Sequence, residues 1–152
     1  VAPDLGEDYT LAQDDQRHRA TFSGIYEIGA GFQVSGLYFF GSGQRRWTTY
    51  GGDRRNVGGG STARLRLDGT IAPRADFVGK PIHRVDARLR KRFRLAGRAT
   101  LDGLVEVFNL FNHANYGTYT TAQSSALYGQ PVYNANVVYM PRSTQFAFRL
   151  AF

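Results

Sequence analysis

Five segments of the chain alternate apolar and polar residues, and this alternation limits the fold more than any other feature of the sequence. The clearest is the last segment, STQFAFRLAF, in which large apolar residues stand at every second position. At the 100° per residue of an α-helix they would fall on two sides, whereas at the 180° per residue of a β-strand they share one face. The segment therefore predicts a strand with an apolar face formed by Phe146, Phe148, Leu150 and Phe152.

The same period of two predicts four more strands. The five predicted strands cover residues 17–28, 32–41, 84–93, 100–111 and 144–152. The fourth is the least regular, because both of its faces carry apolar residues and Asn109 falls on the more apolar one. The three residues from Gly29 to Gly31 predict a tight turn that joins the first two strands as a β-hairpin. The sequence thus predicts an all-β fold, an antiparallel up-and-down meander of about five strands.

The connections between these strands alternate between short and long. Residues 29–31 and 94–99 are short, whereas 42–83 and 112–143 are long and rich in Gly, Ser, Thr, Asn and Tyr. Long loops without secondary structure are uncommon in compact domains. A short–long alternation puts every tight turn at one end of the sheet, as in outer-membrane barrels with short periplasmic turns and long extracellular loops. We therefore expect the five strands to be part of a transmembrane β-barrel, whose large size is implied by the resemblance described below.

The composition excludes several other classes of protein. The chain has no Cys, which excludes disulfides and Cys-ligated metal sites, and it has no apolar run of 18 residues that would predict a transmembrane helix. It begins at Val1 with neither Met nor a secretory leader, so we expect a fragment of a longer protein. A formal net charge of +7 normally raises nucleic acid as a partner, and the positions of the charges decide that question.

The charges of the predicted strands fall on the faces opposite the apolar ones. On the lipid side of a barrel, Arg or Lys costs about 2–4 kcal/mol at the midplane and about 0–1 kcal/mol near the interface. Lys91 is the exception on an apolar face, but it lies near a strand end, where its long stem can carry the amine to the interface. The residues predicted to face the lumen are Arg84, Asp86, Arg88, Arg90, Glu106 and Arg149.

These arginines have two open interpretations once they line a barrel wall. They contact a plug or an anionic solute, or they form a solvated ion-pair network with Glu27, Asp102 and the other acidic residues of neighbouring strands. Their strict alternation argues against a surface that tracks phosphates, so we expect no nucleic-acid partner. The competing hypothesis is a soluble, basic β-sheet module that binds an anionic polymer, either nucleic acid or polysaccharide.

Five stretches of the sequence also resemble a known family. They are DDQRHRATFSGIYEI, GFQVSGLYFFGSG, RVDARLRKRF, VEVFNLFNHANYG and YMPRSTQFAFRLAF. Together they are similar to the C-terminal end of a TonB-dependent outer-membrane receptor, most of all to the Oar-like group. The resemblance runs from Asp14 to the last residue, and its most specific parts are VFNLFNHANYG and the Pro141-Arg142 pair before the final strand.

The resemblance implies a protein of the Gram-negative outer membrane that mediates the energised passage of a large solute. It implies a barrel of about 22 strands with a plugged lumen, of which this chain would supply the last five. The earlier strands, the plug and the segment that contacts TonB are missing from the sequence. The apolar residues of the final strand, which ends in Phe152, resemble the signal that the barrel-assembly machinery reads. Outer-membrane lipid, TonB and that machinery are the implied partners.

No motif in the chain predicts catalysis, a cofactor or a metal site. His18, His83 and His113 lack the spacing to a second ligand that a metal clip requires, and no Ser has a nucleophile-elbow context. The glycine-rich segment around Gly58 lacks the ending of a phosphate loop. We therefore expect no enzyme activity. Aromatic residues in the long loops are candidates for ligand contact: Trp47, Tyr50, Tyr116 and Tyr119.

Overall fold

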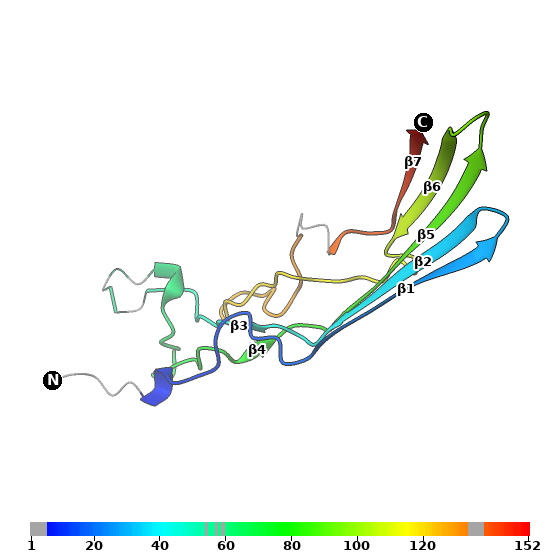
Figure 1. The fold of residues 1–152 in the computed structure, drawn as a ribbon. Helices are drawn as coiled ribbons and strands as arrows, with labels where there is room; N and C mark the ends of the chain where they lie inside the picture. Colours follow the sequence, from blue (N-terminus) through cyan, green and yellow to red (C-terminus); the bar gives the residue numbers. More distant parts are fainter. Residues whose placement is uncertain (1–5, 54, 57, 59, 134–138) are drawn as a thin grey trace. The chain divides into compact units, whose positions relative to one another are not determined.

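A computed structural model of the chain describes residues 6–152 except 54, 57, 59 and 134–138. Its main feature is one antiparallel sheet of five long strands in the order β1-β2-β5-β6-β7 (Figure 1). The strands are β1 (Arg19–Gly29), β2 (Phe32–Gly41), β5 (Ile82–Arg94), β6 (Thr100–Phe108) and β7 (Ser143–Ala151). Each strand pairs with the next in the sheet, so the predicted all-β, up-and-down meander is confirmed.

The register of the sheet brings the alternating residues of all five strands into common rows. One row consists of Tyr26, Val34, Leu89, Val105 and Phe146. The adjacent row, whose side chains point to the other side, consists of Ile25, Ser35, Arg88, Glu106 and Gln145. We call the side that contains the first row the apolar face and the side that contains the second row the polar face.

The ends of four of the five strands differ from the sequence-based prediction, and only β2 has the predicted bounds. β1 begins at Arg19 and not at residue 17, and β7 covers 143–151 where 144–152 was predicted. β1 extends through Gly29, so two residues, Ala30 and Gly31, join it to β2 where three were predicted. Both have positive φ, as a type I′ hairpin turn requires. β5 begins at Ile82, before the predicted residue 84. β6 ends at Phe108 and not at residue 111, because Asn109 has a φ of 51° and its backbone leaves the ladder.

The long connections contain more structure than their composition predicts. β3 (Arg45–Arg46) and β4 (Phe77–Val78) form a small antiparallel sheet, and two 3-10 turns, η1 (Gly6–Asp8) and η2 (Gly60–Thr62), precede and interrupt them. Backbone hydrogen bonds also join residues 118–120 to residues 129–132. The long connections therefore satisfy part of their polar backbone groups among themselves.

The chain divides into two compact units. One contains the five-stranded sheet, formed by residues 19–41, 82–115 and 135–152, and the other contains the loop segments 1–18, 42–81 and 116–134. The buried hydrophobic side chains among the described residues are Ala72, Ala75 and Ile82, and none of them belongs to the apolar face of the sheet. No helix in the described part of the chain is long and apolar enough to cross a membrane.

Candidate functional site

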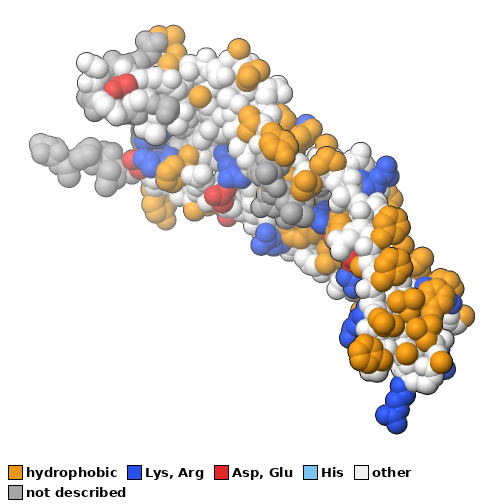
Figure 2. All heavy atoms as spheres, turned by 90° about the horizontal axis from the view of Figure 1, so that it is seen from above, with side chains coloured by type: hydrophobic (Ala, Val, Ile, Leu, Met, Phe, Trp, Pro, Cys, Tyr) orange, Lys and Arg blue, Asp and Glu red, His pale blue; other side chains and the backbone are white. Residues whose placement is uncertain are grey.

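The apolar face of the sheet is uncovered. Its large side chains remain exposed even in the middle of the strands, with Phe22 at 66% and Phe146 at 70% of their full accessible area. Figure 2 shows hydrophobic side chains gathered over the strands of the sheet. A contiguous apolar surface of this kind marks a membrane or a protein interface. The alternation that places these residues on one face therefore produces an apolar surface whose exposure to water is unfavourable.

The polar face shields its charges by pairing them. Arg92 donates two hydrogen bonds to Asp102, both 2.7 Å long. Asp102 is only 4% exposed. Arg88 Nε donates to Glu106 Oε1 across the same two strands at 2.6 Å. Each pair joins directly opposite residues of β5 and β6. Two fixed partners across a strand pair stabilise the register as well as the charge.

Two further ion pairs continue this network. Arg90 Nη2 lies 3.4 Å from Glu27 Oε1, two strands away, and Arg84 Nε lies 2.8 Å from Asp86 Oδ1 on its own strand. All four carboxylates on the polar face of the described strands are thus paired with arginine. The register places the predicted charged set on this one face: Arg84, Asp86, Arg88, Arg90, Glu106 and Arg149.

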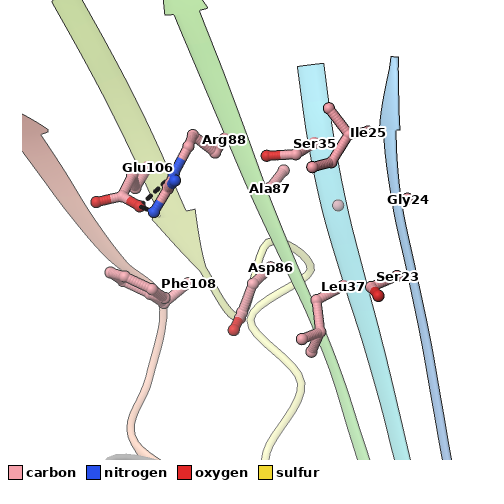
Figure 3. A pocket seen from close by; sticks show the side chains of 11 residues that line it. Ser23, Gly24, Ile25, Ser35, Leu37, Asp86, Ala87, Arg88, Glu106 and Phe108 are labelled. Carbon is pink, nitrogen blue, oxygen red and sulfur yellow. Dashed lines mark hydrogen bonds and ion pairs between the residues drawn. The ribbon is translucent and has the colours of Figure 1, made fainter. Parts of the chain in front are cut away.

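The polar face is hollowed where β1, β2, β5 and β6 lie side by side. The hollow has a volume of about 520 Å³ and is open on one side. Figure 3 shows the paired Arg88 and Glu106 on one flank, with Ser23, Ser35 and Ile25 on the flank of the other two strands. The hollow therefore lies on the polar face, with the Arg88–Glu106 ion pair in its wall.

The two ends of the apolar face differ in chemistry. Near the short turns, Lys91 Nζ lies 4.0 Å from the centre of the Phe32 ring and 5.6 Å from that of Phe93. At the other end, the Tyr38 hydroxyl lies 3.0 Å from Nδ1 of His83. The eight steps along the strand from His83 to Lys91 span about 26 Å at about 3.3 Å each. That length is comparable to the apolar band of an outer-membrane barrel, about 25 Å tall and bordered by aromatic rings.

The residues proposed as an assembly signal lie on the last strand of the sheet. Phe146, Phe148 and Leu150 of β7 point to the apolar face opposite Val105, Gly103 and Leu101 of β6, and Phe152 follows the strand. All four of these predicted residues are more than half exposed. Their arrangement makes one face of β7 continuously apolar.

An asparagine clasp at the end of β6 was missed by the sequence analysis. Asn109, which is 2% exposed, donates from its side chain to the carbonyl oxygens of His113 and Met140 and accepts from His113 N. Asn112 Oδ1 accepts from Arg142 N, and Asn115 exchanges two hydrogen bonds with the backbone of His83. The available signal was the repetition of Asn at every third residue in FNLFNHAN. The clasp ties this segment to the beginnings of β5 and β7.

The loop aromatics predicted to contact a ligand take part in interactions within their own unit. Tyr119 packs its ring 4.9 Å from that of Phe77, and its hydroxyl accepts from Lys80 N at 2.9 Å. Tyr116 lies edge-on to Tyr119 at 6.5 Å, and Arg74 stacks on the Trp47 ring at 5.2 Å. The fourth candidate, Tyr50, donates its backbone N–H to Ala63 O. Tyr119 is therefore a packing residue of this unit.

The histidines of the sheet unit lie together without forming a metal site. His83 and His113 have ring centres 5.3 Å apart, with Phe40 packed against the first at 5.2 Å. No group of three or more His, Asp or Glu side chains that could hold a metal ion occurs in the part of the chain that the structure describes. The rings of His83 and His113 therefore pack against each other, and His83 also lies within hydrogen-bond distance of the Tyr38 hydroxyl.

Comparison with known proteins gives one match. A family model described as an outer membrane beta barrel domain matches residues 68–145, about half of the chain. The matched segment includes β4, β5, β6 and the beginning of β7. No curated protein and no solved structure matches the chain significantly.

Proposed function

The chain belongs to the outer membrane beta barrel domain family and lies in the outer membrane, and from this premise we propose that it is part of the barrel of a TonB-dependent receptor. In that role the polar face lines the lumen, and the apolar face meets outer-membrane lipid. The whole receptor would pass a large solute with energy transmitted by TonB. The host would be a Gram-negative bacterium.

The observation that carries this proposal is the inversion of the sheet. Phenylalanines are exposed on one face, while carboxylates such as Asp102 are shielded and paired with arginine on the other. In water, the exposed face would favour aggregation, whereas in a bilayer it replaces lipid–lipid contacts. The same inversion is found in porins and larger barrels, which have a polar interior and an apolar outer band.

The finer part of the proposal rests on the sequence resemblance to the TonB-dependent, Oar-like receptors. It adds three partners: the remaining strands with a plug in their lumen, TonB, and the barrel-assembly machinery that would read Phe146, Phe148, Leu150 and Phe152. The polar face, on which four arginines of β5 are paired with carboxylates, would contact the plug. We propose no catalytic activity and no cofactor for this wall.

The alternative of a soluble, basic module that binds an anionic polymer is not favoured. Arg84, Arg88, Arg90 and Arg92 are each engaged by a carboxylate, so the row of arginines is not a free positive surface for phosphates. Membership in an outer-membrane family also means that lipid, and not water, surrounds the exposed apolar face.

Two experiments test the proposal. Sequencing of the complete coding region should reveal roughly 17 further strand-like segments and a preceding globular plug, as expected for a barrel of about 22 strands. The complete protein, purified in detergent, should then bind the C-terminal domain of TonB in a pull-down. A coding region with room for only a few further strands, or a complete protein that does not bind TonB, would refute the TonB-dependent assignment and leave the barrel assignment intact.

A further inference from the structure

Lys91 is chemically isolated on the apolar face. Within the five described strands, it is the one Lys, Arg, Asp or Glu on that face, since the register turns every other charged side chain to the polar face or to a strand end. No carboxylate in the described part of the chain lies within ion-pair distance of its amine. The contrast with the polar face, where every carboxylate has an arginine, makes Lys91 an uncompensated cation.

The surroundings of this amine hold it in place and leave room for a ligand. Its contacts are the Ala30 carbonyl oxygen, which accepts one hydrogen bond, and the rings of Phe32 and Phe93. An ammonium group has three donors, so two remain for a partner from outside the sheet. Aromatic rings at a membrane interface lie at headgroup level, where the available acceptors are lipid phosphates and glycerol oxygens.

Two further cations lie at the same end of the sheet, Arg94 on the polar face and Arg98 in the turn. Arg98 lies in the turn 95–99 between β5 and β6, where its side chain is exposed. Among the described residues it forms no ion pair. The nearest carboxylates in this part of the sheet, Asp102 and Glu27, are already paired with Arg92 and Arg90. The short-turn end therefore carries a net positive charge beside the apolar face, which complements an anionic lipid surface.

We propose that Lys91 is a binding site for an anionic phospholipid, with its amine on the headgroup phosphate and Arg98 adding attraction from the turn. The acyl chains of the same lipid would lie along the apolar side chains of β5 and its neighbours. The occupant is thus a lipid that is anionic at its headgroup and apolar in its tails, which a free phosphate does not match. This inference depends on the membrane embedding of the family and not on transport or on TonB, so the two proposals fail independently.

The test compares two cations of one strand that point to opposite faces. Native mass spectrometry of the complete protein in detergent would measure the binding of phosphatidylglycerol and, separately, of phosphatidylcholine. Lys91→Gln should weaken phosphatidylglycerol binding about fivefold, the equivalent of about 1 kcal/mol for one cation near an anionic surface. Lys91→Arg should restore most of the binding. Arg94→Gln removes an unpaired cation three residues away on the polar face and should leave binding unchanged.

Three outcomes would overturn the proposal. They are unchanged phosphatidylglycerol binding in Lys91→Gln, an equal loss in Arg94→Gln, and full displacement of the lipid by inorganic phosphate at constant ionic strength. Equal binding of phosphatidylcholine and phosphatidylglycerol by the unaltered protein would also contradict an anionic site. Circular dichroism of each variant would confirm that the proteins compared have the same strand content. A second control is Lys80→Gln, which removes the other lysine of the chain. Lys80 lies over the Tyr116 ring in the unit formed by the loop segments.

Discussion

The two faces of the sheet use the same backbone to meet opposite solvents. On the apolar face, large side chains such as Phe146 stay exposed, and Lys91 is the one charge, at an end of the strands. On the polar face, arginine and carboxylate alternate across strands and form pairs around a hollow. The difference shows that an exposed apolar side chain is not a defect in the fold of such a chain. Each face is matched to what lies beyond it, hydrocarbon or water.

The sharpest way to break this comparison is to put one charge on each face. Phe146→Arg places a guanidinium in the middle of the apolar face, in the row with Val105 and Leu89, and should cost about 2–4 kcal/mol and strongly reduce assembly. Ala147→Arg, the adjacent residue, points to the polar face and should be mild. The measurement is the folded fraction in outer membranes, from heat-modifiable gel mobility of the complete protein. Equal loss in both variants would show that the two faces do not meet different solvents.

A smaller effect is expected when a carboxylate of the polar face is removed. Asp102→Ala leaves Arg92 without its two hydrogen bonds and should measurably lower the free energy of unfolding. Glu27→Ala breaks a longer, more exposed pair with Arg90 and should cost less than about 1 kcal/mol. Urea unfolding in lipid vesicles would measure both. A larger loss for Glu27→Ala would mean that shielding does not set the strength of these pairs.

The smallest expected effect is the pH dependence of Asp68, a carboxylate outside the sheet whose hydrogen-bond donors come from Thr70. Hydrogen bonds from the Thr70 hydroxyl and backbone N–H hold the pKa of Asp68 below its ordinary value of 3.8. A lowered pKa means that the turn gains stability from the ionised form above that ordinary value and loses it as the pH falls through the folded-state pKa. The amide NMR signal of Thr70 should therefore shift only in acid, and Asp68→Asn should remove that shift. A midpoint above 3.8 would contradict the geometry.

Much of the sheet could be predicted because alternation is a local property of the strand backbone. Phe146 and Arg149 could be assigned to opposite faces from sequence spacing alone, since successive side chains point to opposite sides. The short turns likewise predicted which strands are neighbours. The prediction failed after Phe108, because the predicted strand continues to residue 111. The backbone of Asn109 turns to a φ of 51° and leaves the ladder, and its side chain instead donates to the carbonyl oxygens of His113 and Met140.

The sequence by itself determined that the chain is all-β, which residues share a face in each strand, and that charge and apolar surface are kept apart. Only the tertiary structure decided which arginine meets which carboxylate, that Lys91 has none, and that the polar face is hollowed. The physical reason is that alternation depends on the pleat of one strand, whereas the pairing of side chains depends on the register between strands. That register is set by contacts between residues far apart in the chain, such as Glu27 and Arg90.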